Sequence, residues 1–246
     1  MPEIEVEADS FEEAQAIVLP QIESIWARYC EPGRELRTFG NREKLTAFAG
    51  GEIYFDKENH VYTNEAGEVY LSGSQYAKSF EQPFNAEVVS AAVAKKSGSD
   101  PREIQEMWEL KGSVSRDFGS AIHAALELYG RFKGLSEALG KDYHIHNHPV
   151  IKLAVEKFYA EHRGTYGHEL LVVDHTSKRA GRIDILETVE DGVIVGDFKT
   201  NADIDKALPT YKKQLEFYGG ILEANGYRIS GYQIHHWNGE WNTIDF

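Results

Sequence analysis

The spacing of apolar positions predicts that helices dominate residues 86–164. In residues 114–132, "VSRDFGSAIHAALELYGRF", four apolar positions recur at offsets 0, 4, 8 and 11, which forms one helical stripe: Phe118, Ile122, Leu126 and Tyr129. In residues 147–164, Asn147 or His148 can cap a helix, Pro149 suits its first turn and Gly164 ends it. A further helix is expected at residues 10–30, with Ile17, Ile22 and Trp26 on its apolar face.

After Gly164 the pattern changes to short β-rich runs. Strands are expected at residues 168–175, 179–189 and 192–200, a helix at 207–226, and a last pair of strands at 227–237 and 240–246 around "NGE". Residues 53–72 alternate like a hairpin around "NEAGE". The order, helices and then β-β-β-α-β, predicts a mixed α/β fold whose sheet is not purely parallel. Without repeats or linkers, we expect one domain at residues 51–246 after a helical N-terminal extension at residues 1–50.

Composition and charge narrow the class of protein. The chain has 246 residues and a formal net charge of -14, which disfavours broad adhesion to DNA or to anionic membranes but leaves room for local basic clusters. The single Cys30 excludes an internal disulfide and a four-cysteine metal or iron–sulfur site. The acidic start and the lack of a long apolar run predict a cytoplasmic protein.

The apolar run "GVIVGDFKT" ends in two charged residues, Asp197 and Lys199, which are costly to bury. In a strand they point to the same face. If residues 179–189 pair with this strand across the "EDG" turn, Asp184 approaches Asp197, and two such carboxylates favour a bound cation or a shared proton. Hard oxygen ligands favour Mg²⁺ or Mn²⁺. The alternative is a surface salt bridge at the end of a strand.

An ordered series of motifs surrounds these charges. It consists of "FGSAIH" with His123, "HELLVVD" with Glu169, "GRIDIL" with Asp184, "DFK" with Asp197 and Lys199, and "QLEFY" with Gln214 and Tyr218. In this order, over residues 53–237, the chain resembles the PD-(D/E)XK nuclease superfamily. It is most similar to the RecB-like exonuclease branch, which includes many phage exonucleases.

The resemblance implies a restriction-endonuclease-like core and a metal-dependent DNA exonuclease of low sequence specificity, acting in recombination, repair or degradation. The cofactor would be Mg²⁺ or Mn²⁺, held by His123, Asp184, Asp197 and the main-chain carbonyl of Phe198. Catalysis would fall to Asp184, Asp197, Lys199 and Glu169, and substrate binding to Gln214, Tyr218, Arg182 and Lys213. The implied partners are single-stranded DNA or duplex ends and a recombinase or single-strand-binding protein, in a host cytoplasm for a phage protein.

Several simpler interpretations stay open. His123 can be a histidine at the border of the apolar stripe, Gln214 and Tyr218 ordinary helix residues, and Glu169 a partner of Lys178 or Arg179. The histidines at 144, 146 and 148 share a face if extended, although their spacing is not that of a closed zinc site. Gly119, one turn before His123, is expected to leave space for the strand that carries Asp184. The rival functions are a catalytically silent binding module and a structure-specific endonuclease.

Overall fold

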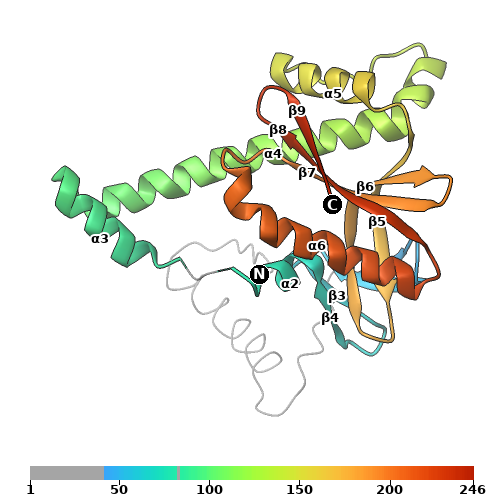
Figure 1. Ribbon diagram of the computed structural model, residues 1–246, viewed down its shortest axis with the longest axis horizontal. Coiled ribbons are helices and arrows are strands. Elements are labelled where there is room, and N and C mark those ends of the chain that lie inside the picture. Colours follow the sequence, from blue (N-terminus) through green and yellow to red (C-terminus); the bar gives the residue numbers. More distant parts are fainter. Residues whose placement is uncertain (1–41, 82–83) are drawn as a thin grey trace, which may run out of the picture. The chain divides into compact units, whose positions relative to one another are not determined.

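The computed structural model describes residues 42–81 and 84–246, and contacts between Cα atoms divide the chain into Met1–Arg42 and Glu43–Phe246. The helix expected at residues 10–30 and Cys30 lie outside the described residues. Within the described ranges, helices pack on a sheet that contains both parallel and antiparallel pairs, so the mixed α/β class is confirmed (Figure 1).

The elements follow one another in this order: β1 (Arg42–Thr46), β2 (Glu52–Asp56), β3 (Val61–Thr63), β4 (Val69–Ser72), α2 (Gly73–Lys78), α3 (Ala86–Ser97), α4 (Pro101–Ala138), α5 (Pro149–Glu161), β5 (Thr165–Asp174), β6 (Arg179–Val189), β7 (Gly192–Lys199), α6 (Ile204–Ala224), β8 (Ile229–Trp237) and β9 (Trp241–Asp245).

The strands are hydrogen-bonded in the order β1-β2-β3-β4-β6-β7-β8-β9, and β5 pairs with β6. The β4–β6 and β7–β8 pairs are parallel, whereas β5–β6, β6–β7 and β8–β9 are antiparallel. As a result, β6 has β5 along one edge and two different strands, β4 and β7, along the other. This arrangement opens a fork in the sheet beside the middle of β6.

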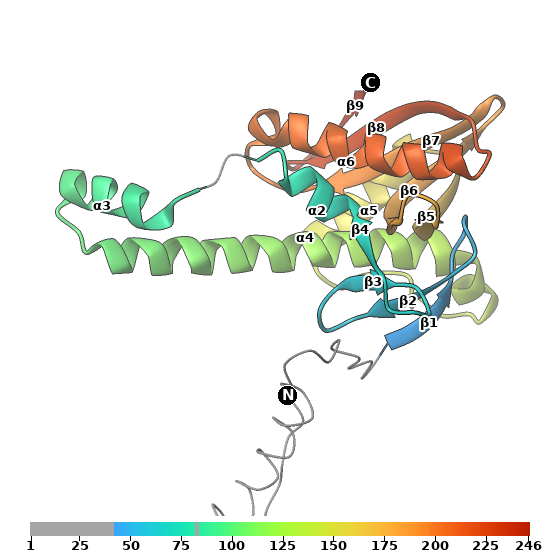
Figure 2. The same ribbon diagram turned by 90° about the horizontal axis from the view of Figure 1, so that it is seen from below.

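Two apolar cores lie on opposite faces of the central strands. On one face α6 packs through Leu215, Ile221 and Leu222, which are buried against β6, β7 and β8. On the other face α4 and α5 pack through Ile122, Leu126 and Phe158. Figure 2 shows α6 and α4 on either side of the strands. The sheet is therefore covered on both faces, and charged groups on its strands are brought against helices.

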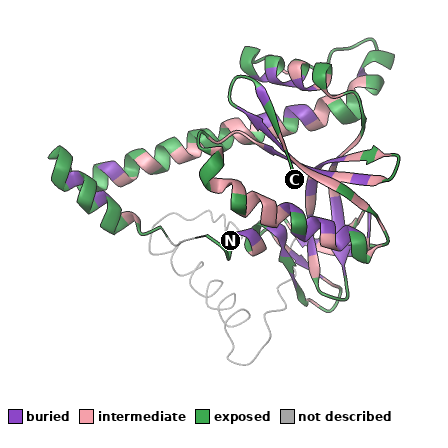
Figure 3. Cartoon of the chain, in the orientation of Figure 1, coloured by how far each residue is buried: buried purple, intermediate pink, exposed green. Residues whose placement is uncertain are grey.

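Helix α4 is much longer than the stripe at residues 114–132 predicts. Asp100 caps it, because its side chain accepts a hydrogen bond from the N–H of Arg102 at 2.8 Å, and Pro101 occupies the first turn. Its C-terminal half packs on the sheet, whereas its N-terminal half packs with α3 and is mostly exposed or partly exposed (Figure 3). Apolar residues such as Met107 and Leu110 are exposed there. The predicted stripe is thus the part of α4 that meets the core.

Other boundaries differ in instructive ways from the expected ones. The region 53–72 contains the expected hairpin around residues 64–68, formed by β3 and β4, but β2 adds a third strand. The extra turn forms because the carboxylate of Asp56 accepts hydrogen bonds from the N–H groups of Glu58 and Asn59. Helix α5 begins at Pro149 after His148, which makes no side-chain cap, and it ends at Glu161, before Gly164. No described helix is both long and apolar enough to cross a membrane.

Candidate metal and catalytic site

The fork beside β6 is where the candidate site lies. Pairing between β6 and β7 ends at Ile185 and Gly196, and β4 pairs with β6 only at Arg179 and Ala180. Asp184 stands between these two stretches. Its carboxylate accepts a hydrogen bond from the N–H of Phe198 at 3.0 Å, so a side chain bridges β6 and β7 where their backbones have separated.

Three side chains from α4, β5 and β6 meet at this fork. One ligand atom each from His123, Glu169 and Asp184 lies within 4.8 Å of the other two, which forms the one such group of histidine, cysteine or acidic residues in the described part of the chain. The Nδ1 atom of His123 is 3.2 Å from a carboxylate oxygen of Asp184. All three side chains are half-buried. They are therefore fixed by the fold and still reachable from solvent.

The pocket beside this group has a volume of about 340 Å³ and is formed mainly by α4. Its lining includes His123, Glu127 and Glu169 together with the small residues Gly119, Ser120 and Ala124. The small side chains on the helix leave open space beside the carboxylates.

The backbone at Glu169 is unusual. In the β5–β6 ladder the pairs on either side of it are His168 with Ile185 and Leu170 with Ile183, so Glu169 stands opposite Asp184. Its φ angle is +50°, in the left-handed region that residues other than glycine rarely adopt within a strand. Burial and the neighbouring charge of Glu127 raise the pKa of the Glu169 carboxyl. A carboxyl with a raised pKa in a pocket is suited to proton transfer.

Asp197 and Lys199 point to the same face of β7, as the alternation predicts, and form an ion pair. Asp197 is buried, with 3% of its surface exposed. Burial and the nearby Asp184 raise the pKa of Asp197, and Lys199 opposes this shift. Burial lowers the pKa of Lys199, but the two carboxylates outweigh it and the net pKa is raised, so the amine stays charged. The predicted approach of Asp184 to Asp197 is therefore present in the fold.

The ammonium group of Lys199 has a second neighbour that sequence reasoning did not assign to it. It lies 4.6 Å from the centre of the Tyr211 ring on α6, a distance at which a cation is attracted to an aromatic face. Tyr211 stands three residues before Gln214 in the helix, so its position near the motif was visible, but its contact with Lys199 depends on how α6 packs on β7.

The residues expected to bind substrate fall into two groups. Gln214 and Tyr218 share one face of α6, and the Gln214 amide donates a hydrogen bond to the Tyr218 hydroxyl at 3.2 Å. The Tyr218 ring is buried and packs where Gly73 and Gly181 leave space, since a Cβ atom at either glycine would lie 2.5 Å from the ring. The buried Tyr218 therefore holds the side chain of Gln214, which is itself half-buried.

The two basic residues of the set lie apart from each other. Lys213 is paired with Glu216 at 2.7 Å on the surface of α6. Arg182 lies on β6 near Glu169 and within hydrogen-bonding reach of the Tyr62 hydroxyl. Arg182 therefore lies beside the candidate site, whereas Lys213 lies on the surface of α6 and is paired with Glu216.

Several expectations change once the geometry is known. Gly119 does not face the strand that carries Asp184, because a Cβ atom there would meet the Thr200 hydroxyl oxygen at 2.9 Å, just after β7. Lys178 and Arg179 are paired with Glu68 and Asp174, so neither is the partner of Glu169.

The expected ligand set also differs in its members. The structure groups Glu169, rather than Asp197, with His123 and Asp184. Phe198 contacts Asp184 through its N–H, and the role expected of its carbonyl stays a prediction. Its side chain is buried and packs edge-on against the Phe158 ring.

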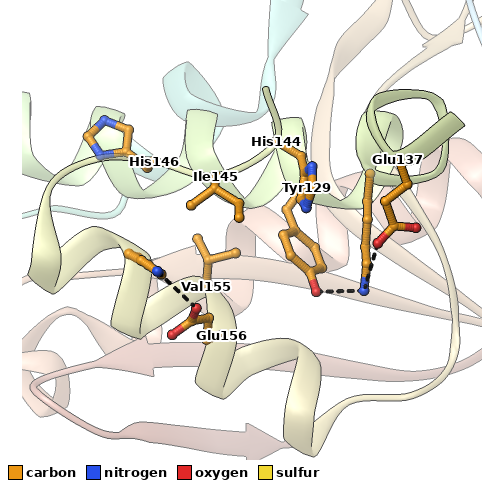
Figure 4. Close-up of a pocket in the computed structure, with 9 residues that line it drawn as sticks. Tyr129, Glu137, His144, Ile145, His146, Val155 and Glu156 are labelled. Carbon is orange, nitrogen blue, oxygen red and sulfur yellow. Dashed lines mark hydrogen bonds and ion pairs between the residues drawn. The ribbon is translucent and has the colours of Figure 1, made fainter. Parts of the chain in front are cut away.

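The histidines of "YHIHNHP" belong to a different place. His144 and His146 line a second pocket, of about 210 Å³, between α4, α5 and the loop that joins them (Figure 4). Nδ1 of His146 accepts a hydrogen bond from the N–H of His148, and the rings of His144 and Tyr129 lie 5.5 Å apart. Among the described residues, these histidines do not form a group whose ligand atoms lie close enough to share a metal ion, so the geometry gives no support to a shared zinc ion.

Comparison with protein-family models gives no match, and comparison with curated proteins gives none either. Among solved structures, the chain is similar to one described as "Crystal structure of SSO0001", with 16% sequence identity and a TM-score of 0.28. The similarity covers 50% of this chain and 65% of that chain, which is less than two thirds of its length. A likeness this weak assigns neither a family nor an activity.

Proposed function

We propose that the protein is a Mg²⁺- or Mn²⁺-dependent DNA exonuclease built on a RecB-like PD-(D/E)XK core. The observation that carries the proposal is the meeting of His123, Glu169 and Asp184 at a fork in the sheet, beside the buried Asp197–Lys199 pair. The resemblance of the ordered motifs suggests DNA ends as the substrate. The geometry of the site suggests the metal-dependent chemistry.

The donor atoms fit a small divalent cation. Ligands about 2.0 to 2.3 Å from a shared ion lie roughly 3 to 4.5 Å from one another. The three donor atoms lie within 4.8 Å of one another without an ion, so small side-chain movements would bring them to this spacing. Two carboxylates suit Mg²⁺, and the imidazole of His123 favours Mn²⁺. When bound, such a cation polarises a phosphodiester and lowers the pKa of a water molecule.

The residues around the cation have separable tasks. The Lys199 ammonium, held between Asp197 and the Tyr211 ring, stabilises the negative charge that builds up on the phosphate oxygens. Asp197 keeps this amine charged and in place. Glu169 would hold the cation together with His123 and Asp184 and so help to orient the attacking water.

The polar residues at the rim position the substrate. Gln214 is half-buried, is held by Tyr218 and lies one turn beyond Tyr211, so it can contact the phosphate backbone or Lys199. Arg182 is placed near Glu169 and can hold a phosphate beside the cluster. Contacts to phosphate carry no base information, so low sequence specificity is expected.

The proposal is tested by incubating the pure protein with end-labelled linear DNA and closed circular DNA, each with Mg²⁺, Mn²⁺ or a chelator. We expect linear DNA to shorten from its ends only when a cation is present, while circles stay intact. Cleavage of circles selects the endonuclease alternative. Binding of DNA without cleavage of either substrate selects the catalytically silent module.

A further inference from the structure

Next to Glu169, a buried histidine ties β5 to the helices behind it. His168 is 5% exposed, and its Nε2 atom lies 2.9 Å from the hydroxyl oxygen of Tyr159 on α5. The same hydroxyl donates a hydrogen bond to the main-chain carbonyl of Leu126 on α4 at 2.9 Å. Because the hydroxyl hydrogen is used there, the Nε2 atom of His168 carries the proton and donates to Tyr159.

This chain of hydrogen bonds joins the two elements that supply candidate metal ligands. Leu126 is three residues after His123 in α4, so it lies about one helical turn away. His168 immediately precedes Glu169 in β5. The Tyr159 hydroxyl therefore stands between the backbone segments that present His123 and Glu169, although Tyr159 itself belongs to neither.

The surrounding packing leaves this link little freedom. A Cβ atom at Gly130 would overlap the His168 ring and the Tyr159 hydroxyl, so only glycine lets α4 approach so closely. On its other side the Tyr159 ring stacks on Tyr129, with centroids 4.5 Å apart and an interplanar angle of 24°. The hydroxyl and the ring of Tyr159 are thus both fixed in position by their contacts.

The link also explains where the strained backbone of Glu169 gets its support. A non-glycine residue at φ +50° is strained and persists only where its surroundings hold it. His168, directly before it, is fixed by Tyr159, and Leu171 and Val172, shortly after it, are buried core residues. The left-handed turn of the chain at Glu169 directs its carboxylate toward Asp184 and His123.

We propose that Tyr159, acting through His168, is a positioning residue that sets the distance between His123 and Glu169 in the metal site. The inference rests on the proposed function only in taking these two residues as ligands. Tyr159 does not touch the cation or the substrate. Loss of the Tyr159 hydroxyl should shift His123 or Glu169 and so weaken binding of the cation, while the fold is kept.

The test measures the dissociation constant for Mn²⁺ by paramagnetic resonance of the free ion, in the full chain, for Tyr159→Phe. This variant keeps the stacked ring and removes both hydrogen bonds. We expect Mn²⁺ binding about 10-fold weaker, as is typical when a partner that orients a ligand is lost. Tyr129→Phe is the matched control, because the Tyr129 hydroxyl accepts a hydrogen bond from Lys133 at 2.9 Å rather than from His168. This variant should bind Mn²⁺ like the wild type.

A second pair of variants separates positioning from packing. His168→Gln keeps an N–H donor for Tyr159 and should restore most of the affinity that His168→Leu loses, at similar thermal stability. Equal affinity in the wild type and Tyr159→Phe overturns the positioning role while the proposed metal site stands. If the wild type itself binds no Mn²⁺, it is the metal site of the proposed function that fails. Equal losses in His168→Gln and His168→Leu would also overturn the inference, because the donor would not matter.

Discussion

Replacing Asp184 by asparagine should stabilise the protein when no divalent cation is present. Asp184 is close enough to Asp197 to raise the pKa of its carboxyl, and both carboxyl groups are at least partly removed from solvent. Folding therefore brings together two like charges that are far apart in the unfolded chain. Asparagine has the same shape as aspartate and no charge, so it removes the repulsion and still offers an oxygen to the N–H of Phe198.

The size of the effect is estimated from Coulomb's law. Two unit charges about 4 Å apart interact by about 4 kcal/mol at an effective dielectric constant near 20. Weakening the hydrogen bond from Phe198 to a charged acceptor costs about 1 to 2 kcal/mol. Asp184 also attracts the charged Lys199 amine, and the loss of this attraction offsets a further part of the gain. The net gain in the free energy of unfolding is then about 1 to 3 kcal/mol, which corresponds to a rise in Tm of roughly 2 to 12 °C for a domain of this size.

The raised pKa of Asp197 predicts how the stabilisation by Asp184→Asn changes with pH. The pKa of Asp197 in the folded protein is raised, so the folded state loses stability as the pH rises through that value. Asp184→Asn removes part of this loss, and its stabilising effect should be larger near pH 8 than near pH 5.5. Thermal unfolding followed by circular dichroism in a chelator measures both. A lower Tm for Asp184→Asn near pH 8 would refute the reasoning and make Asp184 a structural partner of its neighbours.

Three further outcomes are expected. Lys199→Ala should fold normally but lower the turnover of DNA cleavage by roughly 100-fold or more, because one preorganised donor at the reacting phosphate is worth about 3 to 4 kcal/mol; wild-type turnover would contradict this. His123→Ala should weaken Mn²⁺ binding by roughly 10-fold or more, with partial rescue of cleavage at high Mn²⁺. An unchanged Mn²⁺ titration would mean that His123 only packs in the helix and does not bind the cation. Asp174→Asn should lower the free energy of unfolding by about 1 to 2 kcal/mol at pH 7 in urea titrations.

The effect at Asp174 also has a defined pH window. Burial raises the pKa of this carboxyl, but hydrogen bonds from Ser177, Thr176 and Arg179 lower it to about 2. Its stabilisation is therefore present near neutral pH and is lost as the pH falls through the folded value. The difference between wild type and Asp174→Asn should shrink below about pH 4, the ordinary range of an aspartate pKa. A difference independent of pH would mean that the carboxylate charge does not stabilise the turn between β5 and β6.

The sequence predicts the central strands well because their signals are local. The alternation around Ile183 and the turn at residues 190–192 define β6 at Arg179–Val189, as the structure has it. The approach of Asp184 to Asp197 followed from pairing across that turn. The common face of Gln214 and Tyr218 followed from helical spacing. In each case the relevant neighbours lie within a few residues along one element or across one tight turn.

What the sequence could not predict depends on how distant elements pack. The Lys199–Tyr211 contact requires the position of α6 on β7, and the left-handed backbone at Glu169 lies within a strand, without a glycine that would indicate it. Gly119 was matched to the wrong partner for the same reason, because helical spacing gives the face of a residue and not which strand meets it. Helices do dominate residues 86–164, but the apolar stripe at residues 114–132 marks only part of α4, because the N-terminal half of this helix lies away from the core.

The most direct test of the proposed function is a Mn²⁺ titration in which binding and cleavage are measured in the same samples. Free Mn²⁺ is followed by paramagnetic resonance while the shortening of end-labelled linear DNA is timed. If His123, Glu169 and Asp184 hold the cation that cleavage needs, the two half-saturation concentrations coincide, and Asp184→Asn abolishes both binding and cleavage. Cleavage in the presence of a chelator, or saturable Mn²⁺ binding with no cleavage of linear DNA, would contradict a metal-dependent exonuclease.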